Sequence, residues 1–182
     1  GGGIGREHAL LFAREGASVV VNDIGLRTGA DAASVVQEIT DAGGTAVANT
    51  TSATWDGAES IVADTVEAFG RVDIVVNNAT AGAINDLWSF TEEEWDRLTA
   101  INVKSMFLMT KAVLPHMIAG GGGSIVCTSS ISAVAATPME VLYDTTKGAC
   151  HMFARAIAVE FRDRNIRCNA VCPGFVRTPH GN

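Results

Sequence analysis

Short runs of apolar residues alternate with amphipathic stretches along this chain of 182 residues. The amphipathic stretches carry apolar residues at helical spacing, and several stop at a glycine such as Gly16 or Gly70, a residue type that commonly ends helices. The apolar runs are rich in Val and Ile, which is typical of strands buried on both faces. Strands are therefore predicted over five ranges: 17–22, 45–49, 73–77, 124–129 and 166–171.

Helices are predicted between these strands, over residues 6–15, 30–42, 55–69, 91–119 and 143–162. The fourth begins with a capping box from Thr91 to Glu94. Because strands and helices alternate, the strands should form a parallel sheet with helices on each side. The fold class expected is α/β, a doubly wound, Rossmann-like sheet in three layers. No linker or change of composition divides the chain, so residues 1–182 are expected to form a single domain.

Composition and charge narrow the possible functions. Hydrophobic residues make up 47% of the chain and charged residues 18%, which indicates a folded protein. The net charge is −7 without any Lys/Arg cluster, which disfavours nucleic-acid or anionic-membrane partners. No apolar run has the length of a membrane span. The cysteines lack a CxxC motif and the histidines lack metal-ligand spacing, so we expect reduced thiols, a cytoplasmic location and no metal site.

The first residues form a glycine turn that opens a helix, GGGIGREHALL. Gly3, Ile4 and Gly5 would let a phosphate approach the backbone at the helix N-terminus. Asp23 stands at the end of the next predicted strand, where a carboxylate can bind the ribose hydroxyls of an adenosine. A carboxylate there would repel the 2′-phosphate of NADP, and no Lys or Arg directly follows Asp23. NAD is therefore the expected cofactor, with NADP less favoured.

A second set of polar residues points to proton transfer. Tyr143 and Lys147 lie four residues apart, on one face of a predicted helix. Ser130 follows the fourth strand, at the sheet edge where doubly wound folds bind ligands. An ammonium about 4 Å away would supply roughly 4 kcal/mol at an effective dielectric near 20, enough to lower the pKa of a tyrosine by about 3 units. Tyr143 could then accept a hydroxyl proton while hydride leaves for the cofactor, with Ser130 holding the substrate oxygen.

These motifs, in this order, resemble those of the short-chain dehydrogenase/reductase family, in its shorter single-domain branch. GGGIG resembles the end of TGxxxGxG, VNNAT resembles VNNAG, YDTTK matches YxxxK and PGFVRT resembles PGxxxT. The resemblance implies a catalytic tetrad of Asn102, Ser130, Tyr143 and Lys147. In it, Asn102 holds a water of a proton relay and Lys147 also binds the nicotinamide ribose. Besides Gly3, Ile4, Gly5, Asp23, Tyr143 and Lys147, the implied cofactor contacts are Asn77, Asn78, Ala79, Pro173, Gly174, Val176 and Thr178.

Two positions depart from the family pattern. Thr80 stands where the family has glycine, which predicts a displaced or tighter loop beside the cofactor. Thr51 or Ser52 stands where an aspartate usually binds the adenine amine, which predicts a weaker contact.

The resemblance also implies a homodimer or homotetramer. The apolar helical stretches 102–117 and 149–161 would form its interface, because a helix that packs on a sheet by one face needs another cover for its other face.

The expected function is that of an NAD(P)-dependent short-chain alcohol dehydrogenase or ketone reductase. It would interconvert a small secondary alcohol and a ketone by hydride transfer, with the tyrosine as general acid and base. One alternative is an NAD-dependent epimerase or dehydratase of the extended branch, which has GxxGxxG glycine spacing and a longer substrate domain. The other is a cofactor-binding regulator without turnover, which would have no need for the Ser130, Tyr143 and Lys147 set.

A glycine turn of this kind normally follows a β-strand, and no strand precedes it in the given sequence. Gly1 and Gly2 resemble the middle of the turn, so the sequence is expected to be a fragment that lacks the first strand and the C-terminal part. In the strand order 3-2-1-4-5-6, the absent strand lies between those predicted at 17–22 and 73–77. Several unpaired buried backbone groups, at about 1–3 kcal/mol each, rival the stability of a domain. Residues 1–182 alone are therefore expected to aggregate or stay partly unfolded.

Overall fold

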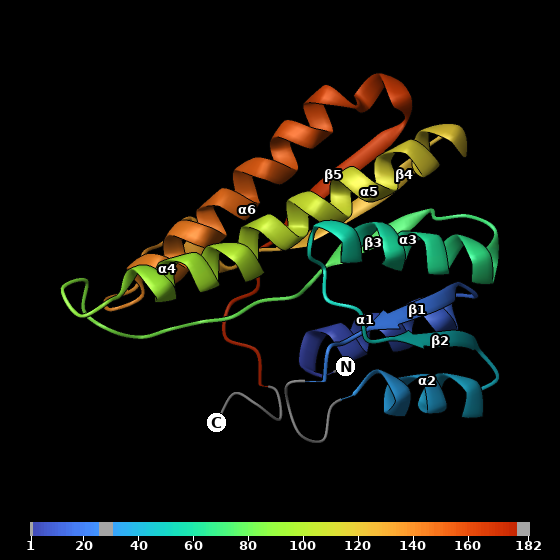
Figure 1. Ribbon diagram of the computed structural model, residues 1–182, viewed down its shortest axis with the longest axis horizontal. Helices are drawn as coiled ribbons and strands as arrows, with labels where there is room; N and C mark the ends of the chain where they lie inside the picture. The colour runs from blue at the N-terminus through green and yellow to red at the C-terminus, as the bar shows by residue number, and fades with distance from the viewer. Residues whose placement is uncertain (1, 26–30, 178–182) are drawn as a thin grey trace. The chain divides into compact units, whose positions relative to one another are not determined.

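The computed structural model describes residues 2–25 and 31–177. Their contacts group into two compact units. The first contains the described residues up to Gly70, together with Val176 and Arg177, and the second contains Arg71–Phe175. Each unit is an arrangement of parallel strands and helices, as the alternating sequence pattern predicts (Figure 1). The α/β, Rossmann-like fold class is confirmed, whereas the single domain stays a prediction.

The first unit is built around two strands. β1 (Ser18–Asn22) and β2 (Thr45–Asn49) pair in parallel, with Ser18 opposite Thr45. Its helices are α1 (Gly3–Arg14), α2 (Ala32–Asp41) and α3 (Trp55–Phe69). Asp31 begins α2 as an N-cap, because its side chain accepts a hydrogen bond from the Ser34 N–H at 2.7 Å.

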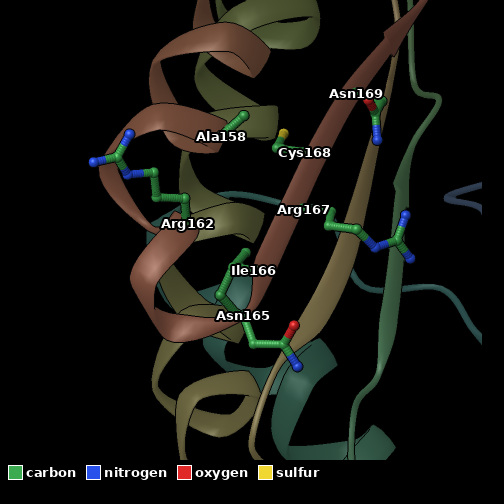
Figure 2. A pocket seen from close by; sticks show the side chains of 7 residues that line it. All are labelled: Ala158, Arg162, Asn165, Ile166, Arg167, Cys168 and Asn169. Atoms are coloured by element: carbon green, nitrogen blue, oxygen red, sulfur yellow. The ribbon is translucent and has the colours of Figure 1, made fainter.

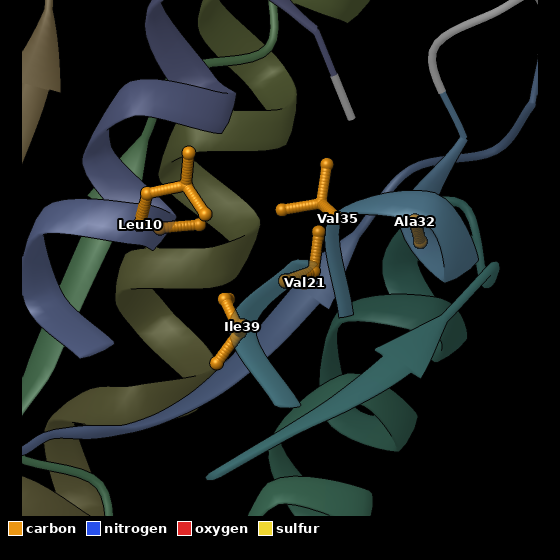
Figure 3. Close-up of a cluster of buried hydrophobic side chains, with 6 residues drawn as sticks. Leu10, Val21, Ala32, Val35 and Ile39 are labelled. Atoms are coloured by element: carbon orange, nitrogen blue, oxygen red, sulfur yellow. The ribbon is translucent and has the colours of Figure 1, made fainter. Parts of the chain in front are cut away.

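The core of the first unit lies where α1 and α2 pack against β1. Figure 3 shows Leu10 of α1, Val21 of β1 and Val35 and Ile39 of α2 directed toward one another. Val35 and Ile39 are each 1% exposed. These two residues are four positions apart and so share one helix face, which explains why the apolar face of α2 is buried while its other positions are exposed.

The second unit contains a three-stranded parallel sheet in the order β3-β4-β5. The strands are β3 (Ile74–Asn77), β4 (Gly123–Thr128) and β5 (Ile166–Val171). Two long helices, α5 (Ser105–Ala119) and α6 (Val141–Glu160), pack along this sheet (Figure 1). The remaining elements are α4 (Glu92–Thr99), the π-helical turn η1 (Ala100–Lys104) and the short 3-10 turns η2 (Ile131–Ala133) and η3 (Arg162–Arg164).

The predicted strands match the observed ones to within a residue at each end, whereas several helices do not; α1 begins at Gly3 instead of residue 6. The helix predicted over residues 91–119 is not uniform, because the π turn η1 interrupts it between α4 and α5. The last helix begins at Val141 and ends at Glu160 instead of spanning 143–162, because η3 forms the turn that follows. The capping box is confirmed, since Thr91 and Glu94 exchange side-chain and backbone hydrogen bonds.

The strands form two sheets instead of the single one predicted. Among the described residues, β1 pairs only with β2, and β3 pairs only with β4. The two strands expected to lack a shared neighbour therefore do lack one within these residues. No helix in the described ranges is long and apolar enough to cross a membrane.

Replacing Ile39 with alanine tests the core of the first unit. Because Ile39 is 1% exposed, Ile39→Ala should destabilise this unit by about 2–5 kcal/mol through lost burial and a residual cavity. Urea unfolding of the full-length protein measures this loss. Leu11→Ala is the matched control, since Leu11 is 54% exposed and should change the unfolding free energy by less than about 0.5 kcal/mol. Equal effects from the two variants would contradict the described packing.

Candidate active site

The four candidate catalytic residues all belong to the second unit. Ser130 follows β4, after Ser129, and precedes η2. Tyr143 and Lys147 lie in the first two turns of α6, and Asn102 lies in the middle of the π turn η1. Ser130, Asn102 and Lys147 are buried and Tyr143 is half-buried.

The pKa of Tyr143 depends on its burial and on its neighbours, Ser130 among them. Burial raises the pKa of Tyr143 above its ordinary value, and the nearby charges of Glu140 and Asp144 raise it further. A hydrogen bond with the Ser130 side chain acts in the opposite direction. This is the expected effect of a hydroxyl that donates to the phenolate, because a hydrogen bond to the charged form favours that form. Ser130 therefore favours the deprotonated form of Tyr143.

Lys147 is the most deeply buried charged side chain of the described residues, at 1% exposure. Its Nζ donates a hydrogen bond to the Thr128 carbonyl at the end of β4, at 2.9 Å. The same Nζ lies 5.5 Å from the centroid of the Tyr143 ring, a cation–π geometry. Burial lowers the pKa of Lys147 below its ordinary value, because the low-dielectric surroundings disfavour the ammonium.

The expectation that Lys147 lowers the pKa of Tyr143 is wrong for this structure. The i, i+4 spacing does bring the two side chains together, but the ammonium lies over the Tyr143 ring and hydrogen bonds to Thr128. Burial of Tyr143 and two neighbouring carboxylates therefore dominate, and the pKa of Tyr143 rises. Sequence spacing gave the proximity of the two groups but not the desolvation, which depends on the surrounding fold.

Asn102 uses its whole side chain to hold a loop and a helix together. Its Oδ1 accepts hydrogen bonds from the Ala81 N–H at 2.7 Å and from the Thr80 hydroxyl at 3.3 Å. Its Nδ2 donates to the Ala81 carbonyl and to the Thr146 hydroxyl, both at 2.9 Å. An Asn side chain offers two donors and two lone pairs, so all four are used. The Asn102 backbone carbonyl accepts a hydrogen bond from Cys150 Sγ at 3.1 Å. The water-holding role implied for Asn102 stays a prediction.

Sequence reasoning missed Thr146, which connects Asn102 to the catalytic helix. The Thr146 hydroxyl donates to the Tyr143 carbonyl at 2.8 Å while it accepts from Asn102. The available signal was a threonine inside the predicted helix, directly before Lys147. A threonine in a helix can donate its hydroxyl to a backbone carbonyl one turn earlier, which here is that of Tyr143. Thr80, noted as a departure from the family glycine, adds a hydroxyl that bonds to Asn102.

The loop after β3, at residues 81–85, lies beside Tyr143. Asn102 holds it at Ala81, and the Asn85 N–H donates to the Met139 carbonyl at 2.9 Å, which ties it to the segment before α6. Between these points, a Cβ atom at Gly82 would lie 3.9 Å from the Tyr143 ring. Met139 has φ +67, an uncommon conformation for a residue other than glycine, so this segment is held in place by its surroundings.

The other cofactor contacts implied in the second unit follow the carboxyl ends of two strands. Asn77 ends β3, and its Nδ2 donates to the Thr110 hydroxyl at 3.3 Å. Asn78 and Ala79 follow it in the loop. Pro173 follows β5, and its carbonyl accepts from the Ile131 N–H at 2.9 Å, beside Ser130. Gly174 is exposed. Val176 belongs to the first unit and Thr178 lies outside the described residues.

Each unit, taken by itself, carries groups that suit a part of a nicotinamide cofactor. In the first unit, α1 begins at Gly3, whose φ of +54 favours glycine, and Gly2 provides no side-chain cap. No acidic residue stands in the first turn, so the N–H groups there, including those of Ile4 and Gly5, suit a phosphate. Asp23 follows β1, and its Oδ1 accepts from the Gly25 N–H at 2.8 Å. In the second unit, Lys147 has two N–H donors without an acceptor among the described residues, which suits a ribose.

A shallow pocket of about 420 Å³ lies elsewhere in the second unit, between the end of α6 and β5. It contains none of the candidate catalytic residues. Figure 2 shows its two arginines, Arg162 and Arg167, extending in opposite directions, so their charges do not converge on one ligand. No group of three or more potential metal ligands occurs within the described part of the chain.

The sequence matches the short chain dehydrogenase family over residues 1–182. The chain belongs to this family. Two relatives illustrate its range of reactions. A cyclopentanol dehydrogenase of Comamonas testosteroni is 38% identical over 97% of this chain and 70% of its own length. A 3-oxoacyl-acyl-carrier-protein reductase of Thermotoga maritima is 37% identical over 97% of this chain and 71% of its own length. This short-chain dehydrogenase thus has both dehydrogenases and reductases among its relatives.

A solved structure supports the same assignment. A short chain dehydrogenase from Mycobacterium avium is 36% identical and superposes with a TM-score of 0.88, over 95% of this chain and 64% of that one. The resemblance inferred from the motifs is therefore confirmed at the level of family and fold. The roles of the individual site residues stay predictions.

The charge of Glu140 provides a test of the environment of Tyr143 in this short-chain dehydrogenase. Because Glu140 raises the pKa of Tyr143, Glu140→Gln should lower that pKa and shift tyrosinate formation to lower pH. Absorbance titration measures this shift, and subtraction of a Tyr143→Phe titration isolates the signal of Tyr143. Glu160→Gln, at the far end of α6, should leave the curve in place. A Glu140→Gln curve at or above the pH of the unmodified protein would show that the described electrostatics are wrong.

Proposed function

We propose that this protein is an NAD-dependent oxidoreductase that interconverts a secondary alcohol and a ketone, with Tyr143 as the general acid and base. The observation that carries the proposal is the buried ammonium of Lys147 over the Tyr143 ring, with Ser130 favouring the deprotonated form of the tyrosine. A polar group buried at such cost points to a function, because burial of an ammonium without a full set of partners is unfavourable. Membership of a family of dehydrogenases and reductases supports the same reaction class.

The side chains divide the work of proton transfer. Tyr143 accepts the proton of the substrate hydroxyl at its Oη during oxidation and returns it during reduction. Ser130 donates a hydrogen bond that stabilises the phenolate and orients the substrate oxygen. Lys147 places positive charge over the face of the Tyr143 ring and keeps two N–H donors for a ribose. The nicotinamide, when bound, supplies the hydride acceptor or donor and adds positive charge.

The residues around Tyr143 favour a partly apolar substrate. Met139 and Val141, just before Tyr143 in the chain, are exposed, as are Ile131 and Val134 on the turn that follows Ser130. Ile84 is 72% exposed in the loop that Asn102 and Met139 hold beside the tyrosine. Exposed apolar side chains gathered near a reactive group are typical of a substrate-binding surface. We therefore propose a secondary alcohol with apolar substituents.

Replacing Tyr143 with phenylalanine tests the catalytic role. Tyr143→Phe keeps the ring but removes the transferable proton, so turnover with NAD and a panel of secondary alcohols should fall about 10²–10⁴-fold. NAD affinity should stay nearly unchanged. Thr145→Val is the matched control on the same helix, since Thr145 is exposed and its hydroxyl donates to the Val141 carbonyl one turn earlier. If Tyr143→Phe keeps more than about a tenth of the rate, the proposed proton transfer is wrong.

Replacing Asp23 with alanine tests the choice of cofactor. Asp23 directly follows β1, where its carboxylate should bind ribose hydroxyls and repel a 2′-phosphate. Asp23→Ala should reduce the preference for NAD mainly by lowering KM for NADP, measured by NADH and NADPH absorbance. Asp41→Ala removes an acid at the end of α2 and should leave the preference unchanged. An unmodified protein that prefers NADP would contradict the proposal.

We further propose that α5 and α6 form the interface of a homodimer or homotetramer. Both helices pack along the sheet, yet Phe107 of α5 and Met152 and Val159 of α6 are exposed, at 43%, 57% and 71%. Met152 and Val159 are seven residues apart and so lie on one helix face. Their exposure leaves an apolar face that a second copy of the chain would cover.

A charge placed on this face tests the proposed interface. Met152→Glu should weaken association, because an unpaired carboxylate would become buried between subunits. Sedimentation equilibrium at micromolar concentration should show a dimer or tetramer for the unmodified protein and a shift toward monomer for the variant. Leu11→Glu adds the same charge at an exposed site of α1 and should leave the association unchanged. A monomeric unmodified protein would contradict the proposal.

A further inference from the structure

Cys172 differs from the other three cysteines of the chain because it is exposed. It follows β5 directly and precedes Pro173. Its Sγ lies 3.5 Å from Nδ1 of His151, a half-buried residue of α6 one turn beyond Lys147. The structure therefore brings together a nucleophilic sulfur and a base from two separate elements. Neither residue has a role in the proposed hydride transfer.

The geometry suits formation of a thiolate. An imidazole nitrogen at hydrogen-bond distance can accept the thiol proton, and the thiolate is the reactive form of cysteine. Cys172 also interacts electrostatically with Lys147: burial lowers the pKa of Lys147, whereas negative charge on Cys150 and Cys172 raises it.

The buried cysteines have the opposite environment. Cys127 and Cys168 lie on neighbouring strands with their Sγ atoms 4.0 Å apart. The hydrogen bond between them and burial raise the pKa of Cys127. Burial also raises the pKa of Cys150, although Lys147 opposes the shift. The same hydrogen bond lowers the pKa of Cys168, but Cys127, Cys150 and Cys168 are all buried, so they should not compete with Cys172 for a reagent in solution.

We propose that Cys172, with His151 as its base, is a site of reversible thiol–disulfide exchange with a small-molecule disulfide such as glutathione disulfide. His151 Nδ1 takes the thiol proton, and Cys172 Sγ attacks one sulfur of the disulfide. A new S–S bond forms between Cys172 and that sulfur, while the original S–S bond breaks. The second thiolate leaves and takes the proton from His151. Cys172 is oxidised and the small disulfide is reduced, so no other oxidant is needed.

The position of Cys172 links this exchange to the candidate active site. The next residue, Pro173, accepts a hydrogen bond from Ile131, which directly follows Ser130. A group attached to Cys172 therefore lies beside the turn that positions Ser130 and close to the charge of Lys147. Modification should lower oxidoreductase turnover until a reducing thiol removes the group. This consequence rests on the proposed function, whereas the exchange itself does not.

The reactivity is tested with dithiobis(nitrobenzoate), an aromatic disulfide that releases a coloured thiolate. The native full-length protein should show a fast reaction at Cys172, located by mass spectrometry of its peptides. The rate at pH 7 should exceed that of an unactivated cysteine in a short peptide by about tenfold, since only a few per cent of an ordinary thiol is ionised there. Cys172→Ser should lose the fast phase, and Cys168→Ser should keep it.

The role of His151 is tested by His151→Gln, which keeps a polar side chain but no base. The fast phase should slow by about tenfold while the thermal melting temperature stays near that of the native protein. A native rate equal to that of the peptide, or an unchanged rate in His151→Gln, would overturn the proposal. Glutathione disulfide should add a glutathione-sized mass to native protein but not to Cys172→Ser. Absence of that adduct would likewise overturn the proposal, whatever the turnover assays show.

Discussion

The candidate active site depends on the hydrogen bonds made by the side-chain amide of Asn102. It binds both backbone groups of Ala81 and the hydroxyl of Thr146, so one buried residue joins the loop after β3 to the helix that carries Tyr143 and Lys147. Thr146 extends this connection to the Tyr143 carbonyl. A buried amide with all four capacities satisfied allows little alternative geometry, because each lost partner would leave an unpaired polar group. The loop after β3 is therefore held beside Tyr143 before any ligand binds.

The π turn is what makes this contact possible. Asn102 stands in the middle of η1, where the helical repeat changes between α4 and α5. Such turns cost stability and frequently occur at functional sites. Lys147 shows the same trade-off, since its burial disfavours the ammonium that the proposed reaction uses. The Thr128 carbonyl and the Tyr143 ring provide partial compensation. A bound cofactor would bring the ribose hydroxyls that the remaining Lys147 donors need.

Much of this arrangement follows from the sequence, because its signals are local. Val/Ile runs marked the five strands, the Thr91 capping box marked the start of α4, and four-residue spacing placed Tyr143 and Lys147 on one face. Other features depend on long-range contacts. The π turn, the partners of Asn102 and the direction of the pKa shift of Tyr143 arise from packing between distant segments. The pairing of Cys172 with His151 was missed for the same reason, since neither residue belongs to a local motif.

Hydrogen exchange at the Ala81 amide, compared between the full-length protein and Asn102→Ala, shows whether Asn102 holds the loop after β3. Loss of the amide side chain should speed exchange at Ala81 by roughly tenfold or more, because a buried hydrogen bond and its network are removed. Asn85→Ala, in the same loop, keeps the backbone bond to Met139 and should leave exchange at Ala81 unchanged. Exchange at Ala81 within about twofold of the unmodified protein in Asn102→Ala would contradict the claim that Asn102 holds this loop in place.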